Sequence, residues 1–205
     1  MVKTQLREKE TLLKEVHHRI KNNIASIVAL LRLQSASVEN TESQNVLNDA
    51  VSRVESMRII YDKLLLSDDY RETSVKNYIE DLVAAVMSIS PESGKITVIT
   101  EIADLKLDVK KLIAIGTIVN ELITNSMKYA FTDRDSGSIS VTLSQKGSEI
   151  TLSFQDDGRG LPDNFDIAAS TGFGLMLVKM FTEQLKGTLE VETRGGTGFT
   201  VRFKI

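Results

Sequence analysis

The sequence of 205 residues contains no cysteine. This absence excludes disulfides, zinc sites built on thiolates and cysteine nucleophiles. It also fits a reducing compartment, so we expect a cytoplasmic protein. Proline is scarce as well, with two residues, and both lie beyond position 90.

Excess basic charge and long apolar runs are missing too. The net charge of -3 and the pI of about 5.5 argue against a general nucleic-acid binder, which needs a basic surface to displace counterions from phosphates. The longest nearly apolar run, Ile24 to Leu33, is about half as long as a membrane-spanning helix. No secretory signal opens the sequence. We therefore expect a soluble chain without a membrane segment.

The first third contains neither glycine nor proline and predicts a helical hairpin. Between the two predicted helices lies a polar link, 35–43, in which Thr41 and Gln44 have the spacing of a capping box. One hairpin buries its apolar seam poorly, so we expect a homodimer with a four-helix bundle. The seam consists of heptad positions in both helices: Leu13, Val16, Ile20, Ile27 and Leu30, then Leu47, Ala50, Val54, Met57, Tyr61 and Leu64.

From about residue 74 the pattern changes to mixed helices and strands. Helical spacing predicts helices at 74–90, 109–131 and 174–185. Alternation predicts strands at 96–101, 138–144, 149–155, 188–193 and 199–205. Short glycine-bearing loops join two strand pairs as hairpins. We predict an α/β sandwich with a mostly antiparallel sheet, and domains at 1–70 and 71–205.

The only two histidines are adjacent, in the segment KEVHHRIKNNI that begins at Lys14. At about 100° of rotation per residue, His18 lies nearly opposite the apolar stripe, whereas His17 lies on its shoulder. Glu15 and Asn22 project within about 60° of His18. A carboxylate beside an imidazole can take up its proton and make the other ring nitrogen a nucleophile near neutral pH. The alternative is an ordinary solvated helix face.

The predicted helix 109–131 carries Glu121, Asn125 and Lys128 on one face, at positions i, i+4 and i+7. An asparagine oxygen can bind Mg²⁺, a glutamate can hold its water shell, and a lysine can meet phosphate charge. On its own, such a stripe is more often an exposed helix face than a metal site.

Two glycine-bearing segments follow, DDGRG at 156–160 and TGFGL at 171–175. A buried Asp156 can accept a hydrogen bond from an exocyclic amine, and glycines allow the backbone to approach a flat ring or a phosphate chain. The glycines that open the second segment's helix would leave helix amides facing phosphates. Taken singly, DDGRG is often a simple turn.

The order of these segments resembles the GHKL ATPase superfamily, and GTGFT at 196–200 completes it at the last strand. Within that superfamily, HHRIKNN on a helical hairpin is similar to the H-box of histidine kinases of the HWE-related class. The resemblance implies an α+β chain, a phosphotransfer hairpin followed by a GHKL-type ATP-binding domain. It further implies a two-component autokinase that uses ATP and Mg²⁺ and passes phosphate to a response-regulator receiver domain.

The resemblance also implies individual roles. His18 would be the phosphoacceptor, with His17 as the second choice. Apart from the resemblance, we hypothesise that Asn22 orients a water for the reverse dephosphorylation. Asn125 would bind Mg²⁺, Glu121 would be the catalytic carboxylate beside it, and Lys128 would contact phosphate. The remaining residues surround the nucleotide: Asp156, Gly158, Gly160 and Thr197 at the adenine, and Gly172 and Gly174 at the phosphates.

One position departs from the wider group of histidine kinases. There an acidic residue follows the phosphorylated histidine and is thought to be its base, but here Arg19 takes that place. We therefore name Glu15 as the candidate base. Residues 161–171 are expected to form an ATP lid, in which Phe165 would replace a separate phenylalanine motif. Two rival functions are a serine/threonine kinase of the anti-sigma type and a nucleotide-gated scaffold without turnover.

Overall fold

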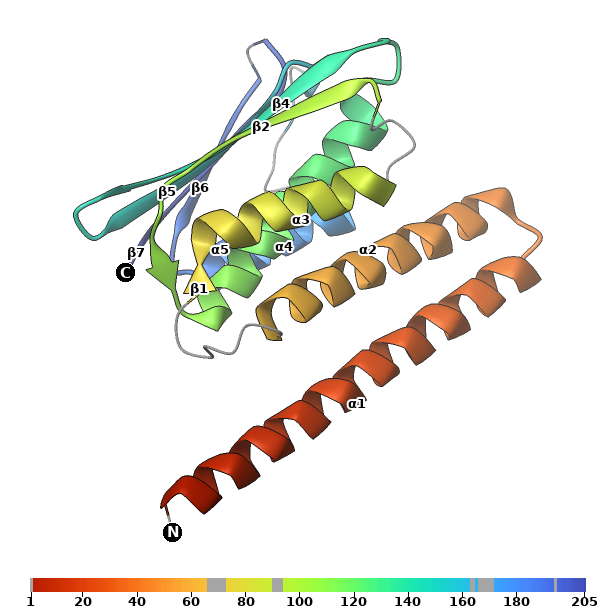
Figure 1. The fold of residues 1–205 in the computed structure, drawn as a ribbon. Helices are drawn as coiled ribbons and strands as arrows, with labels where there is room; N and C mark the ends of the chain where they lie inside the picture. Colours follow the sequence, from red (N-terminus) through yellow and green to blue (C-terminus); the bar gives the residue numbers. More distant parts are fainter. Residues whose placement is uncertain (1, 66–72, 90–93, 163–164, 166–171, 194) are drawn as a thin grey trace. The chain divides into compact units, whose positions relative to one another are not determined.

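Figure 1 shows the computed structural model, which describes all residues except 1, 66–72, 90–93, 163–164, 166–171 and 194. The chain divides into two compact units, Met1–Leu66 and Ser67–Ile205. The first unit is a helical hairpin and the second is a mixed sheet with helices, which confirms the α+β fold expected from the sequence.

Two long helices, α1 (Val2–Ser37) and α2 (Thr41–Leu65), run antiparallel in the first unit. An ion pair of 2.7 Å between Arg32 and Glu55 joins them. A hydrogen bond of 3.0 Å from Ser35 Oγ to Asn48 Oδ1 joins them nearer the connecting loop. Ser35 is buried although it is polar, because this bond satisfies its hydroxyl.

The cap of α2 differs from the capping box expected at Thr41. Asn40 takes the N-cap position, since its Oδ1 accepts a hydrogen bond of 2.9 Å from the backbone N–H of Ser43. The Gln44 side chain instead donates to the carbonyl of Val38 at 2.7 Å. Asparagine is at least as good an N-cap as threonine, so the helix begins with the residue that follows it.

Part of the apolar seam remains uncovered in the single hairpin. Ile27 and Leu30, both seam positions, are 47% and 66% exposed, and Leu33 and Val46 are exposed to a similar degree. Exposed apolar patches of this kind mark interaction surfaces. The homodimer stays a prediction.

The second unit contains the following elements. Its helices are α3 (Val75–Ile89), α4 (Val109–Asn125), the π-helix η1 (Ser126–Ala130) and α5 (Phe173–Gln184). Its strands are β1 (Thr73–Ser74), β2 (Ile96–Ile102), β3 (Lys106–Leu107), β4 (Gly137–Lys146), β5 (Glu149–Asp156), β6 (Thr188–Glu192) and β7 (Gly198–Lys204).

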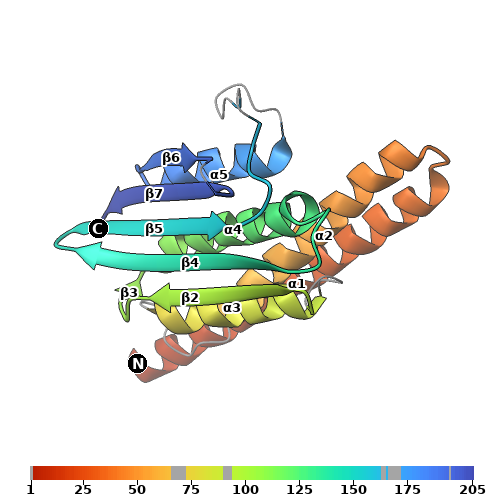
Figure 2. The ribbon, with the colours of Figure 1, turned by 90° about the horizontal axis from the view of Figure 1, so that it is seen from above.

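The main sheet has the strand order β2-β4-β5-β7-β6, and β1 pairs with β3 in a small separate ladder. Only β2 and β4 are parallel within the main sheet as described, so it is mostly antiparallel, as expected. Figure 2 shows that α3, α4 and α5 lie on one face of the sheet. The other face carries polar side chains of the same strands.

Alternation along the strands produces these two faces. Ile139 and Val141 of β4 and Phe154 of β5 are buried toward the helices, whereas Ser140 between them is only partly buried. α4 crosses beneath this apolar face and is itself buried over most of its length. It begins at the N-cap Asp108, whose side chain accepts a hydrogen bond of 3.0 Å from the Lys111 N–H. The sheet and α4 thus form a fixed support for the polar residues at the end of α4.

Candidate functional site

The end of α4 and the π-helix η1 that follows it supply three of the expected site residues. Glu121 is 1% exposed, and Asn125, one helical turn further on, is partly buried. Lys128 follows in η1 and is also partly buried. A buried carboxylate and an amide four residues apart present oxygen atoms to the same side of a helix, which is the donor type that Mg²⁺ requires.

The helix changes type directly after Asn125. Residues Ser126–Ala130 form a π-helix, in which each turn contains more residues than an α-helical turn. Such turns occur often at functional sites. Here the wider turn carries Ser126 and Ala130, both buried, toward the end of β5.

Asp156, the last residue of β5, is 2% exposed and accepts hydrogen bonds at both carboxylate oxygens. Oδ2 accepts from the Ser126 hydroxyl at 2.7 Å. Oδ1 accepts from the backbone N–H groups of Gly158 and Thr197, each at 3.0 Å. These donors hold a charged side chain in the interior and fix its orientation. Oδ2 retains a lone pair that can accept from an amine.

Close backbone packing explains two glycines around Asp156. A Cβ atom on Gly158 would lie 2.5 Å from the Cβ of Ala130, so only glycine fits against η1. Gly196 has φ of +118°, and a Cβ there would lie 1.9 Å from the Asp156 carbonyl oxygen. Both positions therefore require glycine for steric reasons.

The remaining expected residues lie around this centre. Gly160, with φ of +75°, approaches the carbonyl of Gly196, and Thr197 is buried next to it. Gly172 is the N-cap residue of α5, Gly174 is buried in its first turn, and α5 packs against α4. Most of the expected lid, 161–171, lies outside the described residues; Phe165 is partly buried and its N–H donates to the Pro162 carbonyl at 2.8 Å.

Sequence reasoning missed Ser126 at this centre and the buried Asn120 in the adjoining helix α4. Ser126 provides the hydroxyl that binds Asp156, yet the two lie 30 residues apart and no spacing rule connects them. Asn120, next to Glu121, is buried, and its Oδ1 accepts no hydrogen bond from the described part of the chain. Asn120 follows the apolar Ile118 and Val119 and directly precedes Glu121, and this polar pair was a visible signal for a polar contact in the interior.

The candidate phosphoacceptor lies in the first unit. His18, Glu15 and Asn22 are exposed on α1, whereas the side chain of His17 lies outside what the structure describes. The Glu15 carboxylate forms an ion pair of 2.9 Å with Arg19. Among the described contacts, none joins Glu15 to His18. An exposed ion pair of this kind contributes about 0.2–1 kcal/mol, so Glu15 can exchange partners readily.

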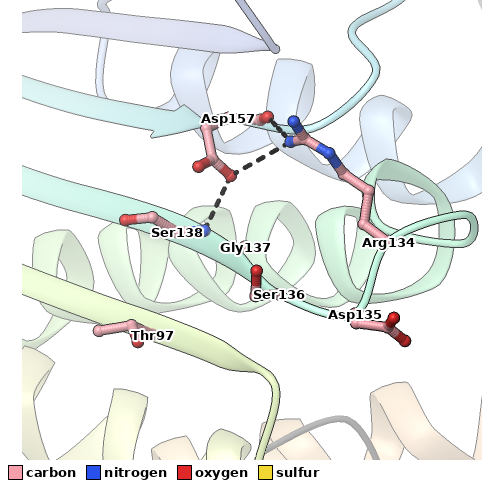
Figure 3. Close-up of a pocket in the computed structure, with 7 residues that line it drawn as sticks. All are labelled: Thr97, Arg134, Asp135, Ser136, Gly137, Ser138 and Asp157. Atoms are coloured by element: carbon pink, nitrogen blue, oxygen red, sulfur yellow. Dashed lines mark hydrogen bonds and ion pairs between the residues drawn. The ribbon is translucent and has the colours of Figure 1, made fainter.

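A cavity of about 590 Å³ lies elsewhere on the second unit, at the start of β4 (Figure 3). Thr97 and Ser138, neighbours on β2 and β4, point away from the helices and line it together with Arg134 and Asp157. Asp156, in contrast, points toward the helices. The cavity is therefore separate from the Asp156 centre, although the two share the turn at the end of β5.

The described residues contain no cluster of three or more histidine, aspartate or glutamate side chains that could hold a metal ion. A Mg²⁺ ion bound mainly by phosphates and water needs only one or two protein ligands, so Glu121 and Asn125 suffice for it. None of the described helices is long and apolar enough to cross a membrane.

Two family models match most of the chain. Residues 15–90 match the model described as histidine kinase, and residues 110–205 match that of the histidine kinase-, DNA gyrase B-, and HSP90-like ATPases. This chain belongs to the histidine kinases. The first match includes His18 and the second includes the whole Asp156 centre. The ATPase match implies that this histidine kinase chain uses ATP.

Similar histidine kinases come from several bacteria. The chain is 31% identical to blue-light-activated histidine kinase 2 of Erythrobacter litoralis over 204 residues, which cover 97% of the chain and 58% of that protein. It is 29% identical to the sensor histidine kinase PdtaS of Mycolicibacterium smegmatis over 205 residues, or 98% of the chain and 41% of that protein. The chain thus spans about half the length of these relatives.

A solved structure shares the fold. The histidine kinase domain of a blue-light activated histidine kinase from Erythrobacter litoralis matches with a TM-score of 0.68 and 27% identity, covering 98% of the chain and 94% of that domain. The anti-sigma F factor of Shouchella clausii is 26% identical over 117 residues, which cover 52% of the chain and 80% of that protein.

Proposed function

We propose that the chain is an ATP-dependent histidine autokinase of a two-component system. In this proposal it phosphorylates His18 and passes the phosphoryl group to an aspartate of a response-regulator receiver domain. The observation that supports it best is the presence, in one chain, of a histidine kinase match around an exposed histidine and an ATPase match around a buried aspartate. A cytoplasmic location and a homodimer are parts of the same proposal.

The two alternative functions, a serine/threonine kinase of the anti-sigma type and a nucleotide-gated scaffold, have weaker support. The likeness to an anti-sigma F factor extends over 52% of the chain, and a kinase of that type would not need the hairpin with its histidine. A nucleotide-gated scaffold would bind ATP but would not become phosphorylated. The occurrence of a buried glutamate, an asparagine and a lysine at the end of α4 favours turnover.

In the nucleotide site, Asp156 accepts a hydrogen bond from the adenine amino group. Its orientation is already fixed by Ser126 and by two backbone N–H groups, which leaves little rearrangement for binding. Gly158, Gly160 and Thr197 line the base. Gly172 and Gly174, at the N-terminus of α5, let backbone amides approach the phosphates.

Glu121 and Asn125 would hold Mg²⁺, which would neutralise charge on the phosphates. Lys128 adds a positive charge at the same end of the helix. Glu121 is buried, so its carboxylate is held in one place by the surrounding α4 and sheet. These residues position the γ-phosphate and balance its charge, which is the main contribution of a protein to phosphoryl transfer.

The reaction takes place at a ring nitrogen of His18. This nitrogen attacks the γ-phosphorus, an N–P bond forms, and the P–O bond to the leaving ADP breaks in line with it. The imidazole then loses its other ring proton to a base. Glu15, one turn before His18, is the proposed base once it has left Arg19.

The test is to incubate the full chain with Mg²⁺ and ATP and to locate added phosphate by mass spectrometry at neutral to alkaline pH. We expect one phosphate, stable to alkali and lost in acid, which then moves to an added receiver domain. ATP binding without any phosphorylation would favour the scaffold. The proposed role of Asn22 is tested in the same mixture, because the receiver should stay phosphorylated longer with an Asn22→Ala protein.

Replacing Glu15 by glutamine should slow phosphorylation of His18 by about 10²-fold or more, the usual contribution of a general base. ATP affinity should stay unchanged, because Glu15 lies on α1 and not in the nucleotide site. Single-turnover phosphorylation rates measure the effect, with Glu39→Gln in the exposed interhelical loop as the matched control. A normal rate in the Glu15→Gln protein would remove Glu15 from the mechanism.

A further inference from the structure

The segment between η1 and β4 carries one side chain that reaches back to the Asp156 turn. Residues 132–136 are all exposed. In Figure 3 the guanidinium of Arg134 extends toward Asp157, and its NH1 donates to the backbone carbonyl of that residue. The same nitrogen lies 3.8 Å from Asp157 Oδ1. We call this contact between Arg134 and Asp157 the latch.

The latch belongs to a larger set of contacts around the turn at 156–160. The Asp157 carboxylate also accepts a hydrogen bond of 2.8 Å from the Ser138 N–H, and the Asp157 N–H donates to the Ser138 carbonyl at 3.1 Å. On the other side, the Arg159 N–H donates to the carbonyl of Ala130 at 3.1 Å. The turn is thus hydrogen-bonded both to the end of η1 and to the start of β4.

These two ends carry different parts of the proposed ATP site. Asn125 and Lys128, for the metal ion and the phosphates, belong to the helix end. Asp156 and Gly158, for the adenine, belong to the turn. ATP is a single molecule that must reach both, so the spacing between the helix end and the turn determines how well it fits.

We propose that Arg134 is a positioning residue for ATP, because the latch adds to the direct contacts between the phosphate-binding helix end and the adenine-binding turn, and so helps to hold the spacing between them. The proposal rests on the proposed function. In this proposal Arg134 acts through Asp157 and does not itself bind the nucleotide. Within the described structure, it is the side chain of the 132–136 segment that ties this segment to the turn.

The cavity beside the latch does not point to a separate ligand. Its walls contain one guanidinium, Arg134, which is already bound to Asp157. They also contain a second carboxylate, Asp135, which would oppose an anionic ligand. Arg134 and Asp157 are thus engaged with each other, as in a structural contact between two loops.

The experiment measures three dissociation constants on the full chain: for ATP with Mg²⁺, for adenosine, and for inorganic triphosphate with Mg²⁺. In the Arg134→Ala protein, the dissociation constant for ATP should rise by about three- to tenfold, as expected for loss of one partly exposed ion pair with a hydrogen bond. Adenosine and triphosphate should each bind within about twofold of the unchanged protein, because neither ligand spans both ends.

Two further variants separate the positioning role of Arg134 from the effect of removing a positive charge. Arg134→Lys keeps a donor that can reach the Asp157 carbonyl and should recover part of the ATP affinity. Lys146→Ala removes an equal charge at the far end of β4, about 30 Å away along the strand, and should change nothing. Thermal unfolding of each protein checks that the domain is folded, and the Arg134→Lys protein serves if Arg134→Ala unfolds.

If the Arg134→Ala protein binds ATP as tightly as the unchanged protein, Arg134 is not a positioning residue for ATP. This result would leave the proposed function intact. Equal losses for all three ligands would also overturn the latch proposal, since they would show general damage to the domain. If the unchanged protein fails to bind ATP, the proposed function fails and the latch proposal fails with it.

Discussion

Replacing His18 by alanine is expected to abolish acid-labile phosphorylation of the chain while ATP affinity stays the same. The reaction needs a nucleophilic ring nitrogen, and alanine offers none, so the loss should be complete. His18 is exposed on α1, and its removal disturbs no described packing contact. The stability of the hairpin should therefore stay within about 0.5 kcal/mol of the unchanged protein.

The matched control is His17→Ala, which alters the neighbouring histidine on the same helix. Mass spectrometry at alkaline pH, with ATP binding measured in parallel, follows both proteins. We expect the His17→Ala protein to retain the phosphate. If the phosphate persists in the His18→Ala protein and is lost from His17→Ala, the phosphoacceptor is His17 and the assignment to the exposed face is wrong.

Replacing Asp156 by asparagine should weaken ATP binding by about 100-fold. Asp156 accepts from three donors, and an asparagine oxygen cannot replace both carboxylate oxygens. Its NH₂ group would face either the Ser126 hydroxyl or two backbone N–H groups. The loss of the hydrogen bond from the adenine amino group to a charged acceptor costs up to about 3 kcal/mol of binding free energy, which corresponds to roughly two powers of ten in the dissociation constant.

The internal donors that lose their acceptor lower the stability of the fold, so thermal unfolding should be measured together with binding. Asp133→Asn, in the exposed segment before β4, is the matched control and should leave both quantities unchanged. Normal ATP affinity in a folded Asp156→Asn protein would show that the adenine is recognised elsewhere. The His18 phosphorylation rate at saturating ATP should recover in part, because the phosphates still contact the end of α4.

Regular patterns in the sequence predicted the regular parts of the fold. Alternation located β4 and β5 to within two residues at each end, because one face of each strand is buried against helices. Helical spacing predicted one helix over 109–131, but the chain changes to a π-helix at Ser126. Apolar spacing cannot distinguish these two helix types over five residues. The two-residue strands β1 and β3 are too short to show any alternation.

The parts of the candidate site that could be predicted contain residue types that seldom occupy such positions for structural reasons alone. Asp156 at the end of an alternating strand, followed by Gly158 and Gly160, indicated a polar centre from the sequence alone. Ser126 was not predictable, because its role depends on contact with a strand 30 residues away. The helical wheel placed Glu15 close to His18, but the same geometry brings it close to Arg19, and opposite charge decides the pairing.

The π-helical turn also limits how the length of this segment can change. Removing one residue between 126 and 130 would favour an ordinary α-helix, and each later side chain would then rotate by about 100° about the helix axis. Ala130 would no longer face Gly158, and the support beneath the turn would be lost. The exposed segment 132–136 has no such restriction apart from Arg134. Insertions and deletions should therefore be tolerated after η1 and selected against within it.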